Sequence, residues 1–423
     1  MLQINYLRDK KDEVLARLKI KNFKELDLID KAIEVDSDRR KIQQELDAIL
    51  NESNTIAKQV GDLFKAGKKA EADDLKNKSV ALKETAKTLE EQQRNVELEL
   101  QSILVKIPNV PSSKVPAGVK PEDNEKVAEH GTIPVLPETA QPHWELAAKY
   151  NIIDFELGVK LTGAGFPVYK GKGARLQRAL INYFLDKATA AGYMEIQPPI
   201  MVNADSGFAT GQLPDKEGQM YFASEDGLYL IPTAEVPITN IYRDVILKAE
   251  DLPIKNCGYT PCFRREAGSY GKDVRGLNRL HQFDKVEIVQ IAHPSKSYET
   301  LEDMVQFVAG LLKELELPYR IMKLCGGDMS FNSALTYDFE VFSAAQKRWL
   351  EVSSVSNFEA FQSNRLKLRF REGAEKPQLA HTLNGSALAL PRIVASLLEN
   401  NQSDRGIAIP KALAAYTGFD YIV

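Results

Sequence analysis

The chain has 423 residues, of which 43% are hydrophobic and 27% charged, with a formal net charge of −4. These proportions are ordinary for a globular protein, exclude a collagen-like or wholly disordered chain, and give no independent sign of a nucleic-acid partner. No stretch approaches the ~18 apolar residues of a membrane span and the N-terminus lacks a signal-peptide pattern, so we expect a cytoplasmic protein without a membrane segment. Because Cys257, Cys262 and Cys325 form no CxxC pair, we expect reduced thiols and no zinc site.

Two successive heptad patterns occupy the N-terminal quarter of the chain. Apolar positions recur with 4,3 spacing from Leu28 to Leu63, and a second seam runs from Leu75 to Ile103. This spacing is typical of a coiled coil, and Gly67 between the seams can end a helix. The sequence therefore predicts an antiparallel helical hairpin whose arms, at about 1.5 Å per residue, each extend on the order of 50 Å.

The heptads by themselves favour a dimerisation or scaffold coil. A lysine cluster near the predicted tip, opposed by the single acid Asp62, nevertheless predicts a local positive patch suited to phosphate contact. The lysines of this tip cluster are Lys58, Lys65, Lys68 and Lys69.

Seven prolines and few periodic apolar positions follow the heptads, between residues 106 and 142. We interpret residues 1–105 as the helical arm, 106–142 as a linker and 143–423 as the main body. In the body, short β-like runs alternate with amphipathic helices without the regular order of a doubly wound sheet, which predicts an α+β fold.

The segment GYMEIQPPIM, residues 192–201, follows a helical pattern that ends at Gly192. It resembles motif 1 of class II aminoacyl-tRNA synthetases, in which a long helix precedes a strand with a key proline, here Pro199. That family uses this segment as a dimer interface, so the resemblance implies a homodimer.

Two further segments, CFRRE at 262–266 and RLHQFDKVE at 279–287, flank a polar, glycine-bearing loop. Together they resemble class II motif 2 in its seryl form. The family's fold is an antiparallel β-sheet flanked by helices, and we expect that catalytic domain to follow the coiled-coil hairpin.

Alternation along strands predicts that Arg264 and Glu266 share one face of the first strand, and that Phe283, Lys285 and Glu287 share one face of the second. If both faces turn the same way, a guanidinium, a phenyl ring and carboxylates converge in a pocket suited to ATP.

In such a pocket the Glu266 carboxylate can accept a hydrogen bond from the adenine amino group. The resemblance implies the other roles: Arg264 on the α-phosphate, Arg279 on the γ-phosphate, Phe283 stacked on adenine, and Glu287 in the serine pocket.

Between motifs 1 and 2, the sequence Thr233-Ala234-Glu235 resembles the TxE loop of seryl-tRNA synthetases. The family uses this glutamate to hold the substrate ammonium, with the threonine beside it. By itself, such a turn before a helix is better interpreted as an N-terminal cap, but its position between motifs 1 and 2 favours the substrate role.

Downstream, WLEVSSVSN at 349–357 resembles the family's E-[IV]-S-S segment, which implies that Glu351 and Ser354 bind the Mg²⁺ that bridges the ATP phosphates. Oxygen ligands suit this ion. Strict alternation, however, places Ser353 rather than Ser354 on the face of Glu351. The implied metal site therefore requires the strand to end or bulge here.

The segment HTLNGSALALPR at 381–392 resembles class II motif 3, although Pro391 stands where many members have glycine. We expect Pro391 to be the first helical residue and Arg392 to lie in the first turn. The helix dipole disfavours a cation there, and an anionic ligand at the helix start would offset that penalty. The resemblance implies that Arg392 contacts the γ-phosphate and, with Arg264, is catalytic; Asn384 and Ser386 meet the serine substrate.

Taken together, the order of arm, linker and motifs resembles a bacterial-type seryl-tRNA synthetase. The resemblance implies activation of L-serine with ATP and Mg²⁺, followed by transfer to tRNA(Ser), whose long variable arm the helical hairpin grips; whether tRNA(Sec) is also a substrate stays open. Three alternatives are another class II specificity, a paralogue that charges a carrier protein, and a non-enzymatic coiled-coil scaffold.

Overall fold

The computed structural model describes residues 1–215, 218–266 and 275–423. Two compact units divide these residues. The first comprises Met1–Lys19 and Phe23–Pro108, and the second comprises Ile20–Asn22 and Asn109–Val423.

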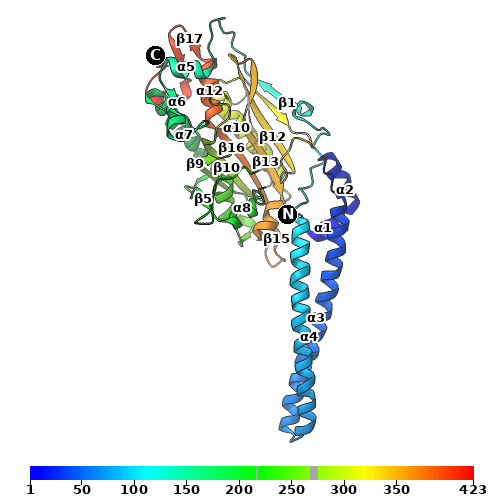
Figure 1. The fold of residues 1–423 in the computed structure, drawn as a ribbon. Helices are drawn as coiled ribbons and strands as arrows, with labels where there is room; N and C mark the ends of the chain where they lie inside the picture. Colours follow the sequence, from blue (N-terminus) through cyan, green and yellow to red (C-terminus); the bar gives the residue numbers. More distant parts are fainter. Residues whose placement is uncertain (216–217, 267–274) are drawn as a thin grey trace. The chain divides into compact units, whose positions relative to one another are not determined.

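The first unit is dominated by a helical hairpin (Figure 1). Its helices are α1 (Ile4–Asp9), α2 (Lys11–Ile20), α3 (Asp27–Lys65) and α4 (Lys69–Leu104). Leu46 of α3 packs against Ala86 and Leu89 of α4, as the heptads predict. Gly67 has φ +75° in the turn between the two long helices, a conformation that costs glycine little. The predicted coiled-coil hairpin is confirmed.

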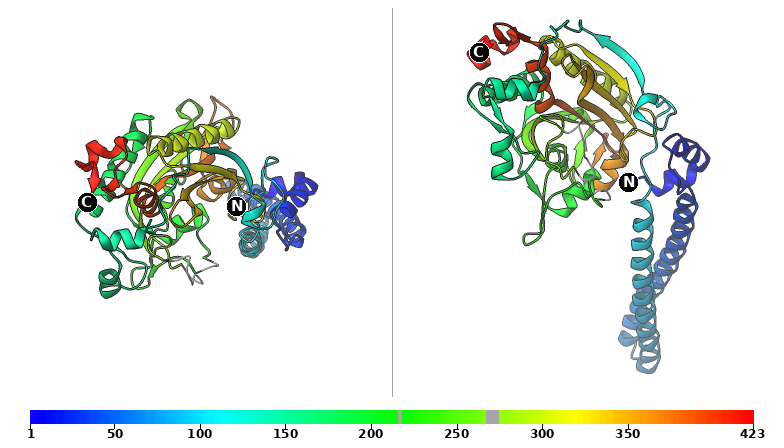
Figure 2. Two further views of the ribbon diagram at one scale, coloured as in Figure 1. Left: turned by 90° about the horizontal axis from the view of Figure 1, so that it is seen from above. Right: turned by 45° about the horizontal axis from the view of Figure 1, so that its top comes forward.

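The second unit is built on an eight-stranded sheet in the order β1-β11-β12-β13-β16-β10-β9-β4. Neighbouring strands are antiparallel except for β4, which pairs with β9 in parallel. The strand β1 lies at one edge of the sheet, beside β11 (Figure 2). The strands are β1 (Glu125–His130), β4 (Met194–Glu195), β9 (Ile254–Phe263), β10 (Gln282–Ala292), β11 (Tyr319–Lys323), β12 (Leu335–Ser343), β13 (Arg348–Glu359) and β16 (His381–Ala389).

Helices cover the two faces of this sheet unequally. The amphipathic helices α7 (Gly171–Ala190), α10 (Ser297–Glu314) and α12 (Leu390–Asn400) form the main core with one face, which includes Val286 and Ile288 of β10. The opposite face carries the short helix α9 (Glu235–Asn240), whose Ile238 packs against Val289. The α9 face is therefore the one left open for a site.

Smaller elements surround this frame. The remaining helices are α5 (His143–Lys149), α6 (Phe155–Leu161), α8 (Ala204–Thr210), α11 (Ala360–Leu366), α13 (Lys411–Thr417) and the 3₁₀ turns η1 (Pro121–Asp123) and η2 (Ala249–Asp251). The remaining strands are β2 (Ile153–Asp154), β3 (Val168–Tyr169), β5 (Met201–Val202), β6 (Phe222–Ala223), β7 (Leu228–Leu230), β8 (Ile246–Lys248), β14 (Arg369–Arg371), β15 (Gln378–Leu379), β17 (Gln402–Ser403), β18 (Gly406–Ala408) and β19 (Tyr421–Ile422).

The segment interpreted as a linker is more than a connection, because its strand β1 pairs with β11 and extends the sheet. Lys21 also belongs to the second unit: its buried ammonium donates to the carbonyls of Asn109, Phe331 and Ser333 at 3.3, 3.0 and 2.9 Å. Prolines mark where regular structure is interrupted, but they do not prevent short strands between them.

Motif 1 differs in detail from the expectation. Helix α7 ends at Ala190, two residues before Gly192, which has φ +85°. The strand that follows, β4, has only two residues, and Pro199 lies outside regular structure between β4 and β5. A proline lacks the N–H that a strand ladder uses, which accounts for its position.

Candidate active site

A buried ionic cluster lies on the α9 face of the sheet. Lys285 and Glu287, two residues apart on β10, have 5% and 1% exposure, and Lys285 Nζ is 2.6 Å from Glu287 Oε2. The ammonium also donates to Thr233 Oγ1 at 2.8 Å, and the Thr233 hydroxyl donates to Glu287 at 3.2 Å. Burial raises the pKa of Glu287, and the charge of Lys285 opposes that rise. The predicted common face of Lys285 and Glu287 is confirmed.

A second buried carboxylate, Glu235, begins helix α9 and has 5% exposure. Its Oε1 accepts a hydrogen bond of 2.6 Å from the Gln362 amide. Burial, and then the nearby charge of Glu287, raises the pKa of Glu235 to about 7. Glu235 and Glu287 thus place two buried carboxyl groups beside one ammonium, that of Lys285, so the cluster can accept a further cation.

Strand β16 completes this cluster from the neighbouring position in the sheet. Ser386 is paired with Glu287 in the β10–β16 register, and the Asn384 amide donates to Glu287 Oε1 at 3.1 Å. All five residues of the expected serine pocket thus lie on adjacent elements of the second unit: Thr233, Glu235, Glu287, Asn384 and Ser386.

The guanidinium of Arg264 lies over the Phe283 ring, with 5.3 Å between its central carbon and the ring centroid. The charge of Arg264 also opposes the rise that burial causes in the pKa of Glu235 and of Glu287, so the guanidinium lies near both carboxyls. The predicted convergence of guanidinium, phenyl ring and carboxylates is therefore present. Its expected cause is wrong in part: β9 ends at Phe263, before Arg264, so no strand alternation positions Arg264 and Glu266.

Glu266 instead occupies a left-handed conformation with φ +48°. Its carboxylate forms an ion pair and hydrogen bond with Arg279 Nε, which joins the two ends of the motif 2 loop. Most of that loop, residues 267–274, lies outside the described residues.

Arg392 lies in the first turn of α12, as expected, but the helix begins at Leu390, so Pro391 is the second helical residue rather than the first. Neither position needs a backbone N–H. Arg392 donates to the carbonyl of Asn278 at 3.1 Å and to that of Glu351 at 2.6 Å, and lies 3.7 Å from the Glu351 carboxylate.

The β12–β13 pairing contains the irregularity that the Glu351–Ser354 site requires. Phe339 is paired with Ser353 while Glu340 is paired with Glu351, so Val352 is an extra residue in β13. Such a bulge reverses the alternation beyond it. Glu351 is exposed, whereas Ser353 turns inward and donates to the Ser386 carbonyl. The bulge therefore places Glu351 and Ser354 on the same face of β13.

Three residues of this region were assigned no role from the sequence. Gln362 and Asp338 come from distant segments with no local motif, whereas Lys285 was placed on the correct face without a role. Burial, and then the charge of Glu351, raises the pKa of Asp338, and a hydrogen bond from Ser354 opposes that rise. Within the described parts of the chain, no group of three or more His, Cys, Asp or Glu is arranged around a metal position.

The tip cluster of lysines is less positive than the sequence suggested. Lys65 lies 3.9 Å from Asp62 and Lys68 lies 3.1 Å from Glu71, which the sequence interpretation left out. These side chains are exposed, and exposed ion pairs are weak. Each lysine can therefore leave its carboxylate and pair with another anion.

Comparison with known proteins agrees with this geometry. Residues 221–401 match the family model of the class II tRNA synthetase core domain for G, H, P, S and T, and residues 1–111 match that of the seryl-tRNA synthetase N-terminal domain. Fold and site thus define a class II aminoacyl-tRNA synthetase. A serine–tRNA ligase of Salinibacter ruber is 50% identical, covering 99% of this chain and 98% of its own length. The chain belongs to the seryl-tRNA synthetase family.

Other relatives extend the similarity over the whole chain. A serine–tRNA ligase of Chlorobium phaeobacteroides is 44% identical with full coverage of both chains. The crystal structure of seryl-tRNA synthetase from Pyrococcus horikoshii complexed with ATP has a TM-score of 0.92 at 32% identity, covering 100% of this chain and 99% of that one. For the cytoplasmic enzyme of Naegleria fowleri in complex with AMP the TM-score is 0.87 at 27% identity, with 100% and 98% coverage.

Proposed function

We propose that the chain activates L-serine with ATP and transfers the seryl group to the 3′-terminal adenosine of tRNA(Ser). The observation that carries the proposal is the pair of buried carboxylates, Glu235 and Glu287, beside the Arg264–Phe283 contact. A carboxylate can bind the substrate ammonium, a second polar group can bind its hydroxyl, and an arginine on an aromatic ring can bind a nucleotide.

In the first step, a carboxylate oxygen of serine forms a bond to the α-phosphorus while the bond to pyrophosphate breaks. Arg264, Arg279 and Arg392 neutralise the phosphate charge and hold the two groups in line. The ribose hydroxyl of tRNA then attacks the carbonyl carbon of the adenylate, and AMP leaves. These steps need no protein nucleophile.

The assigned serine pocket comprises Glu235 for the ammonium, with Thr233, Glu287, Asn384 and Ser386 around the rest of the substrate. The direct test is serine-dependent exchange of pyrophosphate into ATP, measured with all twenty amino acids. Alanine should be rejected by about 10⁴-fold, because polar groups that bind the serine hydroxyl would be left unpaired. Equal activation of alanine would show that Glu287 and Ser386 are misassigned.

Phe283→Ala should raise the KM for ATP by about 10-fold or more, since stacking on a base contributes about 1–3 kcal/mol. The KM for serine should change little, because Phe283 is not in the assigned serine pocket. Phe283→Tyr is the matched control and should retain the wild-type KM for ATP. If both KM values rise equally in Phe283→Ala, the ring supports the whole site and does not bind adenine.

We propose that Glu351 and Ser354 hold Mg²⁺ against the ATP phosphates. Both supply oxygen ligands, the bulge at Val352 permits a common direction, and Mg²⁺ commonly takes only one or two protein ligands. When bound, the ion would neutralise phosphate charge, in addition to the neutralisation that the protein's own arginines provide.

Glu351→Gln should raise the Mg²⁺ concentration needed for half-maximal exchange by about 10- to 100-fold, a typical effect of perturbing a metal site. Glu340→Gln is the matched control, because Glu340 is paired with Glu351 in the sheet but forms its ion pair with Arg320. An unchanged Mg²⁺ requirement in Glu351→Gln would remove this residue from the metal site.

We further propose that the helical hairpin binds tRNA(Ser) and that the chain forms a homodimer through motif 1. Met194 in that motif is 56% exposed and Met201 is 36% exposed, as expected for apolar side chains that a partner covers. No helix of the described residues is long and apolar enough to cross a bilayer. We assign the protein to the cytoplasm, where ATP and tRNA are available.

A further inference from the structure

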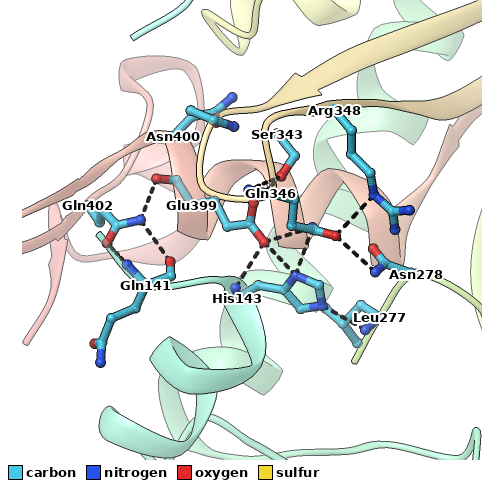
Figure 3. A network of polar contacts seen from close by, with 11 residues as sticks. Gln141, His143, Leu277, Asn278, Ser343, Gln346, Arg348, Glu399, Asn400 and Gln402 are labelled. Carbon is cyan, nitrogen blue, oxygen red and sulfur yellow. Dashed lines mark hydrogen bonds and ion pairs between the residues drawn. The ribbon is translucent and has the colours of Figure 1, made fainter. Parts of the chain in front are cut away.

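A buried histidine, His143, forms polar contacts with Glu399 and Leu277 in the second unit (Figure 3). His143 begins α5 and is fully buried. Its Nε2 accepts a hydrogen bond of 2.8 Å from the backbone N–H of Leu277. An amide N–H can only donate, so the ring proton must be on Nδ1, which lies 2.6 Å from Glu399 Oε1. The imidazole therefore links Leu277 to Glu399 in one defined tautomer.

Glu399, near the end of α12, is fully buried and holds this tautomer. Besides the ring, its carboxylate accepts hydrogen bonds from the His143 backbone N–H at 2.9 Å, from the Gln346 amide at 2.9 Å and from the Ser343 hydroxyl. Burial acts to raise the pKa of Glu399, but the His143 and Ser343 hydrogen bonds outweigh it and hold that pKa below its usual value. A carboxylate with this many donors is a rigid anchor.

The segment returning from the motif 2 loop fits closely around the histidine. A Cβ on Gly276, where φ is +68°, would lie 2.2 Å from His143 Nε2. The preceding Arg275 places its guanidinium 4.8 Å from the centroid of the Trp144 ring. Residues 275–277 therefore dock onto the first turn of α5, and only glycine permits this approach at 276.

The next two residues, Asn278 and Arg279, connect this segment to the arginines assigned to ATP. The Asn278 carbonyl accepts from Arg392 Nε at 3.1 Å, and its side chain donates to Gln346 Oε1 at 3.1 Å. Arg279 follows directly and pairs with Glu266. The backbone that His143 holds at Leu277 thus orients both Arg392 and Arg279.

We propose that His143 is a positioning residue for ATP: it fixes the return of the motif 2 loop through Leu277, and through Asn278 and Arg279 it sets the two arginines against the phosphates. The proposal rests on the proposed function, which assigns Arg279 and Arg392 to ATP. His143 touches neither substrate, and the serine pocket does not depend on it.

A matched pair of variants separates positioning from general stability. In His143→Asn the shorter amide can still donate to Glu399 but cannot reach Leu277, whereas in His143→Gln the amide oxygen can take the place of Nε2. Each variant loses one of the two buried hydrogen bonds, so we expect similar losses in Tm. His143→Asn should raise the KM for ATP by about 10-fold, because the Leu277 N–H loses its partner. His143→Gln should restore the KM for ATP to within about 3-fold of wild type.

The KM for serine should stay near the wild-type value in both variants. Gly276→Ala tests the same contact with His143 and Glu399 intact and should also raise the KM for ATP selectively. The positioning role is overturned if the two His143 variants change both KM values alike in proportion to Tm, or if Gly276→Ala leaves the KM for ATP unchanged. Absence of serine-dependent exchange in the wild-type protein would instead overturn the proposed function, so the two failures are distinguishable.

Discussion

Glu235→Gln should lower kcat/KM for serine in pyrophosphate exchange on the order of 10³-fold. The substitution keeps the shape of the side chain but removes the charge assigned to the substrate ammonium. Leaving one charge of a buried pair without its partner costs about 3–5 kcal/mol, which corresponds to this loss. The KM for ATP should change little, because no ATP contact is assigned to Glu235.

The same carboxyl should set the pH dependence of serine binding. Burial and the neighbouring Glu287 charge raise the pKa of Glu235 to about 7, so the free protein holds a proton there at lower pH. Only the ionised form can pair with an ammonium. In the wild-type protein, the KM for serine should therefore rise as pH falls below about 7, by about tenfold per pH unit once the protonated form dominates.

Two controls assign this pH dependence to one residue. Glu235→Gln should remove the rise in the KM for serine below about pH 7. If that rise survives in this variant, it belongs to Glu287, whose pKa is also raised. Gln362→Met should make the KM for serine begin to rise at a higher pH, because the hydrogen bond from the Gln362 amide lowers the pKa of Glu235 and would be lost. Near-wild-type serine kinetics in Glu235→Gln would mean that the ammonium binds elsewhere.

Shortening the helical hairpin should strongly lower the efficiency of tRNA charging while serine-dependent exchange remains near the wild-type rate. Gln43 of α3 and Gln93 of α4 are hydrogen-bonded across the coil, so residues 44–92 can be replaced by a short Gly-Ser linker at this level. This deletion leaves in place Val35, Leu100 and Ile103, which are buried in the intact chain. Losing one of two linked tRNA contacts should lower charging efficiency by about 10²- to 10⁴-fold.

A full-length variant separates the charge of the arm from its length. Replacing Lys58, Lys65 and Lys69 by glutamine removes positive charge near the tip but keeps the hairpin. If phosphate contact contributes, this variant should charge tRNA more weakly and with a shallower dependence on salt. If the shortened protein loses pyrophosphate exchange as well as tRNA charging, the arm and the catalytic unit do not have separate roles. If the shortened protein charges tRNA at the wild-type level, the arm does not bind tRNA.

The long helices and the chemical groups of the site were predictable because their signals are local. A seven-residue repeat places apolar side chains on one helix face whatever surrounds the helix. The turn after the first repeat needs a residue with positive φ, and Gly67, with φ +75°, is the residue type that adopts it most easily. The convergence of Arg264 with Phe283 was also expected. Its mechanism was not, because alternation applies only inside strands and β9 ends at Phe263.

Other features depend on pairing between segments far apart in the chain. The bulge at Val352 arises because the pairing register between β12 and β13 shifts by one residue. That register depends on both strands together, so it cannot be read from the sequence of either one. Gln362 meets Glu235 across 127 residues, and Glu399 meets His143 across 256. Distances of this kind leave no periodicity in the sequence.

Residue identity therefore determined which groups this protein brings to its chemistry, since a carboxylate, a guanidinium or a phenyl ring has the same charge and shape wherever it lies. Their protonation and orientation were decided only by the folded sheet. Glu235 acquires its raised pKa from burial next to Glu287, and Arg392 acquires its direction from the carbonyls of Asn278 and Glu351. Both effects come from desolvation and close contact, which arise only when distant segments pack together.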